Sequence, residues 1–324
     1  MAGVGAQLFQ PPVTLINTMN GITQKHFAPV LADSIFKPSP TWWRVTRLGR
    51  KLTGGALVWN VVTIEETTGG AYFGTQVLDT SVTDSAVPAE LEWKFYQQTI
   101  AIPMTDYILN SGPEQVISLV MEKEEIAMAS LLQKLSRGIY GVSPQNTTID
   151  IDSLPSALAS SGTYANITIA SGTGWESNGG NGPSSGSAVS LANMQTDYGN
   201  ATFGNEEPDT TIFTQTGWNS FWALLTPNQR FLAEDQETTR AGFKNHLMFN
   251  NSVVLHDQFV PAQEMYMLTN KYTVPAFHRN DYFRVKPFLQ STNQEVLVSR
   301  ITVTLNLQLY TLRQHSRRTG ITNG

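Results

Sequence analysis

The chain contains no cysteine among its 324 residues, and charged side chains are scarce. Without cysteine, disulfide frameworks, zinc–thiolate sites, iron–sulfur clusters and cysteine nucleophiles are all excluded. Lys, Arg, Asp and Glu together make up 15% of the residues, against about 25% in an ordinary soluble domain. Such a neutral surface suits a protein that is largely covered by copies of itself.

A basic surface and a long hydrophobic run are also missing. The 21 basic and 26 acidic residues give a net charge of −5, whereas a general nucleic-acid-binding domain would be basic. Residues 1–24 carry no charged side chain, so the basic region of a signal peptide is not seen. The apolar runs stay far below the roughly 20 residues that a membrane helix needs. We expect a protein of a reducing cytoplasm, or of a particle assembled there, without a membrane partner.

The first hundred residues predict two extended features. Proline punctuates residues 1–41, and no helical or alternating apolar period survives between the prolines, so we expect an arm there, with its end placed at residue 52. Residues 53–101 predict a long hairpin, because two β-rich stretches bracket a polar, glycine-containing excursion too thin to hold its own core. In the second stretch Leu91, Trp93 and Phe95 alternate with charged residues, which predicts a strand with one buried face.

Residues 113–137 predict the longest helix of the chain. They contain no internal glycine or proline after Pro113, apolar residues recur at three- and four-residue steps, and Gly138 supplies a stop. A helix of this length spans roughly 37 Å. Its acidic residues Glu122, Glu124 and Glu125 are expected on a solvated or subunit-facing side, opposite the apolar stripe.

The second half of the chain predicts further strands and a short helix. Residues 209–213 and 253–255 are expected to form buried strands, and residues 218–225 to form a helix with an apolar face. Residues 301–310 alternate between apolar and polar side chains, which predicts a half-buried strand of about ten residues.

Motifs that could carry chemistry are weak. Ser184 lies in a G-x-S-x-G pattern typical of a hydrolase nucleophile, but the pattern falls in a Gly/Ser-rich stretch where such matches arise by chance. The five histidines show no metal-ligand spacing, and His256–Asp257 is interpreted as a surface turn. The sequence therefore predicts no cofactor, no metal site and no enzyme activity, and a serine hydrolase remains a remote alternative.

Adjacent tryptophans and segregated charges indicate a subunit interface. Trp42 and Trp43 cannot both face one core, and Trp and Arg are enriched at interface hot spots. A base-stacking platform that uses the nearby arginines is a less favoured interpretation. Residues 52–93 carry six acidic residues and no basic one, so the hairpin is expected to lie over a basic surface of a neighbouring copy. The candidate interface residues are Trp42, Trp43, Arg44, Arg47, Arg50, Lys51, Glu65, Glu66, Asp79, Asp84, Glu90, Glu92, Arg317 and Arg318.

Taken in order, these features resemble the major capsid proteins of tailed bacteriophages, which have the Hong Kong 97-type fold. The similarity is carried by residues 91–105 running into the long helix, by residues 208–231, by residues 253–270, and by the basic tail at 317–321. The resemblance spans nearly the whole chain and is one of element order. It implies an α+β fold whose parts are an N-terminal arm at 1–52, an extended-loop β-hairpin at 53–101, a peripheral domain at 102–160 with the spine helix at 113–137, an axial domain at 161–285, and a peripheral return strand with a basic tail at 286–324.

The resemblance also implies a function. It predicts a structural, non-enzymatic major capsid (head) protein that self-assembles through hexamers and pentamers into an icosahedral shell, which encloses the double-stranded DNA genome of a tailed phage without sequence-specific binding. A portal and a separate scaffolding protein are the implied partners, and a cement protein is left open. The implied location is the virion capsid, assembled in the host bacterial cytoplasm. An encapsulin-like, protein-filled nanocompartment shell is the alternative. The covalent crosslink of some members is not implied, because residues 52–93 contain no lysine.

Overall fold

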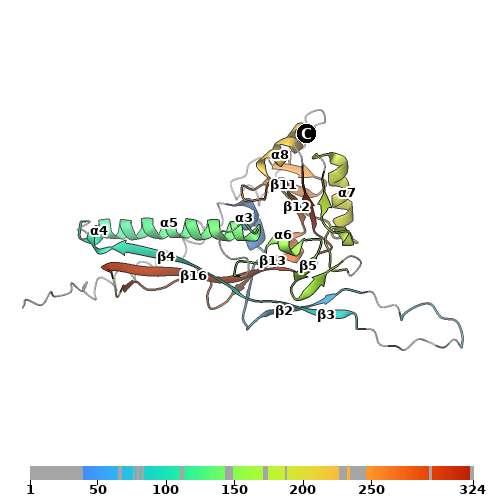
Figure 1. The fold of residues 1–324 in the computed structure, drawn as a ribbon, viewed down its shortest axis with the longest axis horizontal. Coiled ribbons are helices and arrows are strands. Elements are labelled where there is room, and N and C mark those ends of the chain that lie inside the picture. Colours follow the sequence, from blue (N-terminus) through green and yellow to red (C-terminus); the bar gives the residue numbers. More distant parts are fainter. Residues whose placement is uncertain are drawn as a thin grey trace, which may run out of the picture. The chain divides into compact units, whose positions relative to one another are not determined.

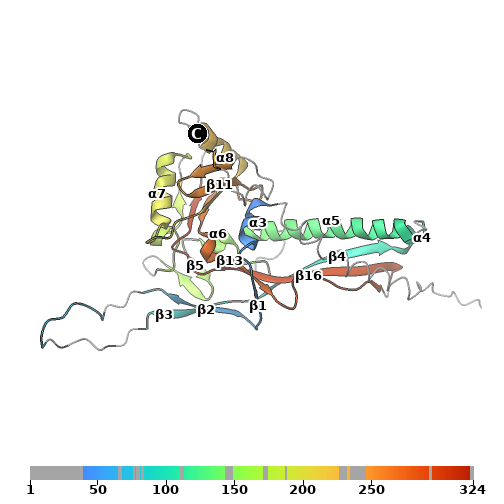
Figure 2. The same ribbon diagram turned by 180° about the vertical axis from the view of Figure 1, so that it is seen from behind.

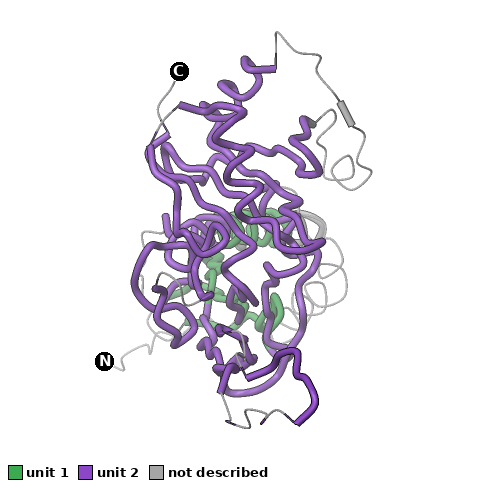
Figure 3. The backbone as a smooth tube through the Cα atoms, turned by 90° about the vertical axis from the view of Figure 1, so that its right-hand side faces the viewer, with its two compact units in different colours: residues 1–35, 96–132, 281–303 green, residues 36–95, 133–280, 304–324 purple. Residues whose placement is uncertain are grey.

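The fold is taken from a computed structural model. It describes residues 39–64, 68–75, 77, 81, 84–109, 113–142, 149–170, 174–186, 188–225, 232–233, 246–291 and 294–321. Most of the predicted arm lies outside these residues. The described chain divides into two compact units, one formed by residues 96–132 and 281–303, and the other by residues 39–95, 133–280 and 304–321 (Figure 3). The domain boundaries expected from the sequence stay predictions.

The first unit combines the long helix with part of a sheet. Helix α5 (Pro113–Ile139) confirms the predicted spine helix and ends two residues later than expected. A short helix, α4 (Met104–Leu109), precedes it. Strands β4 (Lys94–Pro103), β14 (Arg284–Val285) and β15 (Leu289–Gln290) all pair with the long strand β16 (Val296–Leu309). Within this unit α5 runs alongside β4, as Figures 1 and 2 both show.

Two expectations about buried faces in this part of the chain are wrong. Glu124 was expected on a solvated or subunit-facing side of α5, but it is only 1% exposed within its own chain. Phe95 was expected to be buried with Leu91 and Trp93, but it is 77% exposed. Residues 92–93 separate strand β3 from strand β4. After this interruption the alternation of buried and exposed side chains is shifted by one residue, so that Tyr96 is buried instead of Phe95.

The second unit contains a seven-stranded sheet. Its strand order is β7 (Ser184–Ser185), β17 (Ser316–Thr319), β12 (Met265–Leu268), β8 (Thr210–Phe213), β11 (Ser252–His256), β10 (His246–Phe249) and β9 (Leu232–Ala233). Strands β8 and β11 are the two buried strands predicted from the sequence, and they pair in parallel. Helices α7 (Leu191–Ala201) and α8 (Gln215–Leu225) contribute to one hydrophobic core with this sheet, so the predicted helix near residue 218 is also confirmed.

The remaining strands and helices of this unit lie outside the seven-stranded sheet. Strand β1 (Arg50–Leu52) pairs in parallel with β13 (Thr273–His278), and β13 pairs with the C-terminal half of β16. The extended hairpin is β2 (Leu57–Val62) with β3 (Ala86–Leu91), and a second hairpin is β5 (Gly162–Tyr164) with β6 (Ile167–Ile169). Shorter elements are the helices α3 (Pro40–Thr46) and α6 (Leu154–Ala157) and the 3₁₀ turns η2 (Asn178–Gly180) and η3 (Asn270–Tyr272).

Strand β16 was expected to be half-buried, and that is true of only part of it. The alternation holds up to Val303, but residues 303–309 are buried on both faces. The polar side chain of Asn306 is fully buried and donates hydrogen bonds to the Glu92 carbonyl and to the Asp152 carboxylate, both at 2.7 Å. Burial of the Asn306 amide is tolerated because it finds these partners, whereas Oε1 of the buried Gln308 has no hydrogen-bond partner among the described residues.

Candidate assembly surfaces

The hairpin β2–β3 presents an exposed face that is apolar except for Asn60 and Glu90. The pairing of Val58 with Glu90 and of Val62 with Ala86 fixes which side chains share this face. Val58 is 61% exposed and Val62 is 71% exposed, whereas Leu57 on the other face is buried. A strand with branched apolar side chains on both faces is expected to be covered on both faces. Within the described chain, only one face of this hairpin is covered.

The outer part of the hairpin is more exposed still. Every described residue from 69 to 77 is exposed to solvent. Tyr72 is 66% exposed, Phe73 is 91% exposed and Val77 is 92% exposed. Large apolar side chains gathered at such exposure mark an interaction surface.

The base of the hairpin, in contrast, is held by its own chain. The Trp93 indole donates a hydrogen bond of 2.9 Å to the Gly54 carbonyl, and its ring packs edge-on against His278. The Glu90 amide donates to the Ala165 carbonyl at 3.0 Å, which joins β3 to the second hairpin. Trp59 makes an edge-to-face contact with Tyr310. These contacts fix the direction in which the hairpin leaves the second unit.

The side chains of the adjacent residues Trp42 and Trp43 lie in different environments, and Trp42 is no longer an interface candidate. It is 1% exposed and packs edge-on against Phe277, so it is a core residue of its own chain. Trp43 is half-buried, and the exposed Arg47 lies over its ring with 5.8 Å between guanidinium carbon and centroid. The partly exposed pair Trp43–Arg47 is what remains of the predicted anchor.

The other predicted basic residues near the arm differ in the exposure of their side chains. Arg44 donates to Thr210 Oγ1 at 2.6 Å and to the Asp209 carbonyl at 3.2 Å, so its guanidinium joins α3 to strand β8. Arg50 lies over the Tyr310 ring and is exposed, and Lys51 is exposed beside it. Arg50 and Lys51 therefore keep their charges at the surface.

The two arginines of the basic tail bind carboxylates of their own chain. Arg317 makes two hydrogen bonds to Glu264, at 2.6 and 3.2 Å, and a third to the Pro155 carbonyl. Arg318 makes a bidentate contact of 2.6 and 2.9 Å with Asp197, whose side chain is fully buried. The structure thus places both in internal ion pairs, whereas the sequence suggested a surface toward a neighbour.

The predicted acidic residues fall into two groups. Glu65, Glu66 and Asp79 lie outside the described residues. Asp84, Glu90 and Glu92 are exposed, and they lie on or beside the hairpin strands. Their side chains are therefore available to a partner.

The Ser184 motif has a structural role in the described chain. The Ser184 hydroxyl donates to Asp197 Oδ1 at 2.7 Å and accepts from the Asn178 side chain at 3.0 Å. Asp197 is neutralised by Arg318, and no histidine nitrogen among the described residues contacts the hydroxyl. A serine nucleophile needs an adjacent general base. Ser184 instead belongs to the network that joins β7, α7 and β17.

Other groups that could bind an ion or a membrane give no site in the described ranges. Among those residues, no three His, Asp or Glu side chains gather as a metal site would require. None of the described helices is both long and apolar enough to cross a bilayer. His315 is fully buried, which lowers its pKa to about 3, and its Nδ1 accepts a hydrogen bond from the Thr269 amide.

The interpretation of residues 256–257 as a surface turn is wrong for Asp257. Its side chain is 2% exposed and accepts hydrogen bonds from Ser39 Oγ at 2.6 Å and from the Phe259 amide at 3.1 Å. Burial, and next the charge of Asp257, raise the pKa of Tyr140 well above its ordinary value. The Tyr140 hydroxyl donates to Thr41 Oγ1 at 2.7 Å. A buried polar cluster therefore joins α3, the end of α5 and the end of β11.

Sequence reasoning missed several residues whose side chains are exposed. The apolar residues of the hairpin, Val58 and Val62, could have been found because residues 57–62 are apolar on both strand faces. Lys286 and Arg300 were also missed. The alternation after Leu297 would have placed Arg300 outward on β16, and Lys286, which follows β14, bonds through its amide to the Arg300 carbonyl.

Comparisons with known proteins show the fold. No protein-family model and no curated protein sequence matches the chain. The cyanophage A-1(L) capsid asymmetric unit matches with a TM-score of 0.62 at 14% identity, over 87% of this chain and 93% of that one. The capsid of the native GTA particle gives 0.57 at 9% identity, over 86% and 91%. The Synechococcus elongatus SrpI encapsulin gives 0.52 at 10% identity, over 84% of both chains. These likenesses confirm the predicted α+β capsid fold.

Proposed function

We propose that this chain, which has the fold of tailed-phage capsid proteins, is a non-enzymatic subunit that assembles with copies of itself into a closed icosahedral shell. The observation that carries the proposal is the hairpin β2–β3. Its base is fixed to the chain by hydrogen bonds, while Val58, Val62 and Phe73 stay exposed. A lone two-stranded ribbon is marginally stable in water. Contact with a neighbouring subunit would cover these side chains.

The mechanism of assembly is geometric. Burying a side chain of the size of valine or phenylalanine contributes about 1.5–3 kcal/mol, and a closed shell repeats each contact around every symmetry axis. The acidic residues of the hairpin would fix its register on a basic surface, because charge complementarity governs specificity and encounter rate. For the basic side of this contact we retain Trp43, Arg47, Arg50 and Lys51, with Asp84, Glu90 and Glu92 on the acidic side together with Glu65, Glu66 and Asp79.

The contents and partners of the shell follow from the same proposal. The shell would enclose a double-stranded DNA genome, with a portal and a separate scaffolding protein as partners, and would assemble in the bacterial cytoplasm through hexamers and pentamers. The likeness to the cyanophage A-1(L) capsid supports a genome-containing virion. The internal bonding of Ser184 supports a structural role over a hydrolase.

A nanocompartment shell filled with protein is the second candidate function. The observation that favours it is the likeness to the holo-SrpI encapsulin complex. The two functions differ in what the shell contains and share the assembly step.

Electron microscopy of the purified protein tests the assembly step. We expect closed particles of uniform diameter. Nuclease-resistant DNA inside particles from the native source would support the virion, and a co-purifying enzyme inside them would support the nanocompartment. A protein that stays monomeric in every condition, with its scaffolding protein present, would contradict the proposed function.

A further inference from the structure

The extended hairpin leaves the second unit through two short connections. Residues 53–56 lead from β1 into β2, and residues 92–93 lead from β3 into β4. The cross-strand pair of Leu57 with Leu91 lies directly beyond both connections. The ladder of the hairpin therefore ends on both strands at the same level, and the ladder itself does not fix the angle at which the hairpin leaves.

The first connection has a flexible backbone. Gly54 has a φ of +135°, a conformation that other residues rarely adopt. A Cβ on Gly55 would meet no atom within 4 Å, so packing does not require glycine there. Two consecutive exposed glycines form a joint. The bond from the Trp93 indole to the Gly54 carbonyl acts at this joint, so the direction of the hairpin depends on contacts beyond it.

The turn of the second hairpin provides the first of these contacts. The Ala165 carbonyl accepts a hydrogen bond of 3.0 Å from the Glu90 amide. Ala165 and Asn166 are the two central residues of the turn between β5 and β6, and their φ angles are +52° and +61°. Positive φ at both positions matches the twist of the flanking strands, although alanine adopts it at some cost. The turn therefore fixes the direction of the carbonyl that holds β3.

The Tyr310 ring provides the second contact. It meets the Trp59 ring edge-to-face with 5.9 Å between centroids, and the Arg50 guanidinium lies over it at 5.7 Å. The Tyr310 amide donates to the Tyr272 carbonyl at 3.0 Å, which fixes the position of the residue. Because Arg50 precedes the joint and Trp59 follows it, one aromatic ring contacts the chain on both sides of the joint.

The third contact is a close approach of two backbone segments. Gly174 has a φ of +71°, and a Cβ there would lie 2.6 Å from the Thr63 carbonyl oxygen, whereas ordinary van der Waals contact begins at 3.4 Å. Only glycine fits such a position. The backbone at residue 174 therefore lies directly against the chain that follows β2.

Three separate contacts fix the orientation of one rigid element on another. We propose that Ala165, Gly174 and Tyr310, which we call the seat, are positioning residues for assembly, because they set the direction of the hairpin in the single subunit before a neighbour binds. A segment that is already held in its bound orientation loses less freedom on association. This inference rests on the proposed function, since the direction matters where copies meet and ring closure depends on the rotation between them.

Distances between spin labels in the unassembled subunit test the seat, because the natural chain has no cysteine to interfere. The labels are placed at Val62→Cys on the hairpin and at Ala192→Cys on α7, both exposed positions. We expect one narrow distance distribution from the natural seat. Gly174→Ala should shift or broaden it, because the added methyl group must move from 2.6 Å to at least 3.4 Å from the Thr63 oxygen.

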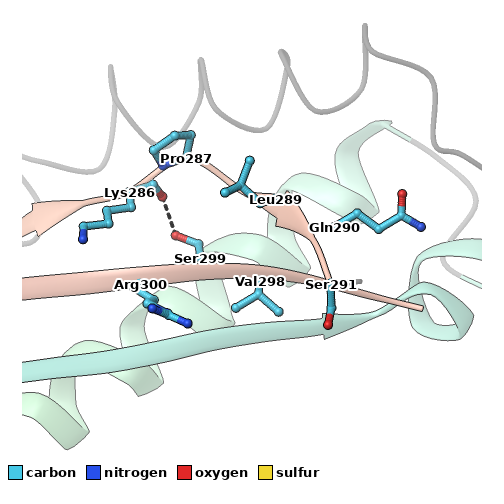
Figure 4. A pocket seen from close by; sticks show the side chains of 8 residues that line it. All are labelled: Lys286, Pro287, Leu289, Gln290, Ser291, Val298, Ser299 and Arg300. Carbon is cyan, nitrogen blue, oxygen red and sulfur yellow. Dashed lines mark hydrogen bonds between the residues drawn. The ribbon is translucent and has the colours of Figure 1, made fainter. Parts of the chain in front are cut away.

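Gly186→Ala is the matched control for backbone strain. Gly186 has a φ of +73°, close to the +71° of Gly174, but a Cβ there would meet no atom within 4 Å. Its distance distribution should stay that of the natural chain, and an equal shift in both variants would overturn the proposal. A control in the first unit is Leu289→Ala, which removes a side chain that is 68% exposed and lines a pocket of about 350 Å³ (Figure 4). A shift of the same size from this control would also overturn the proposal.

Tyr310 provides an independent test with a conservative rescue. Tyr310→Ala removes the ring and should broaden the distance distribution, whereas Tyr310→Phe keeps the contact with Trp59 and should restore the natural width. Circular dichroism checks that each variant folds. If Gly174→Ala does not fold, the two Tyr310 variants decide the proposal, and equal distributions from them would overturn it.

Particle formation by the unlabelled variants connects the seat with assembly. Gly174→Ala and Tyr310→Ala should assemble severalfold more slowly than Gly186→Ala and Tyr310→Phe, and with a wider spread of particle diameters in electron micrographs. A displaced hairpin with a normal assembly rate and uniform particles would overturn the proposal while the proposed function stands. If the natural chain forms no particles, that result counts against the proposed function, and the label distances still decide whether the seat directs the hairpin.

Discussion

Ser39 and Asp257 are joined by a hydrogen bond of 2.6 Å, although 218 residues separate them in the sequence. Both side chains are 2% exposed. The same Ser39 oxygen accepts a hydrogen bond from the Trp42 amide and so caps the N-terminus of α3. One hydroxyl group therefore starts a helix and joins it to the end of strand β11.

Removing the Asp257 carboxylate should cost more stability than removing the Ser39 hydroxyl. Asp257→Ala leaves the buried Ser39 hydroxyl and the part-buried Phe259 amide without this acceptor, and the loss at a buried donor costs about 1–3 kcal/mol. Ser39→Ala loses a helix cap, which costs about 0.5–2 kcal/mol. Urea unfolding of the unassembled subunit measures both, and the exposed Asp84→Ala is the control that should unfold like the natural chain. Equal stability of Asp257→Ala and that control would contradict this assignment.

The ion pair of Asp197 with Arg318 should contribute far more than the exposed pair of Glu206 with Lys271. Asp197→Ala strands a guanidinium whose side chain is 10% exposed, and breaking a buried pair costs about 3–5 kcal/mol. Glu206→Ala breaks a pair whose lysine is 61% exposed, so its unfolding midpoint should barely move. Thermal unfolding of the two variants side by side gives the comparison. Similar midpoints would mean that Arg318 finds another partner.

Acid should weaken the fold through His315. Burial lowers its folded-state pKa to about 3, whereas the unfolded chain binds the proton near pH 6.5. Between these values the unfolded state binds more protons, so stability falls as the pH falls. From pH 6.5 to 5.5 this histidine should account for about 1 kcal/mol of loss.

The variant His315→Asn isolates that contribution, because its amide oxygen can still accept from the Thr269 amide. Urea midpoints at the two pH values should differ less in the variant than in the natural chain. An identical pH dependence of the two proteins would show that His315 does not carry the effect.

The exposed face of the hairpin should be needed for assembly and dispensable for folding. Val62→Asp places a charge on a face that is open in the single chain, so the subunit should fold normally and fail to form particles. Val142→Asp changes a valine that is 49% exposed outside the hairpin, and it should leave assembly intact. Sedimentation gives the particle yield and circular dichroism the fold. Full particle yield from Val62→Asp would remove the hairpin face from the interface.

Charge reversal at Glu65 and Glu66 should impair assembly in a salt-dependent way. Lysines at both positions would repel the basic surface that we assign to the neighbour. This effect should shrink as salt is added, because the Debye length is about 10 Å at 0.1 M and falls at higher salt. Arg47→Glu in the same chain should partly restore the yield. Arg44 is unsuitable for the reversal, because it bonds to Thr210 within its own chain. Normal assembly of the doubly reversed chain at low salt would place these acids in solvent.

Helices and strands could be predicted from the sequence where a single helical or strand periodicity of apolar residues continues without interruption. Helix α5 is an example, since no glycine or proline interrupts its stripe after Pro113. Strand β16 was found from its alternation, but its burial on both faces was not, because the partners of Asn306 come from Glu92 and Asp152, far away in the sequence. The exposure of Phe95 was missed because an interruption of two residues changes the phase without changing the composition.

The interface residues suggested by the sequence stay predictions, and the fold uses some of them inside the chain. Trp43 and Arg47 remain at the surface, but Trp42, Arg317 and Arg318 are used inside the chain. A charge count cannot tell an internal ion pair from a surface patch, because the distinction depends on which carboxylate the fold brings near. Lys286 and Arg300 were missed because their juxtaposition arises from the pairing of two chain segments that a charge count does not show.

During synthesis, the sheet of the second unit cannot be completed until strand β17 has been translated. It lies between β7 and β12, and its Thr319 hydroxyl contacts the Ser184 carbonyl from 135 positions later in the chain. At translation rates of about 5–20 residues per second, β7 waits roughly 7–27 s for its partner. A nascent subunit therefore has an open sheet edge until residues 316–319 leave the ribosome. We expect neighbouring chains on one messenger RNA to become competent for assembly only after that moment, which separates folding from premature association.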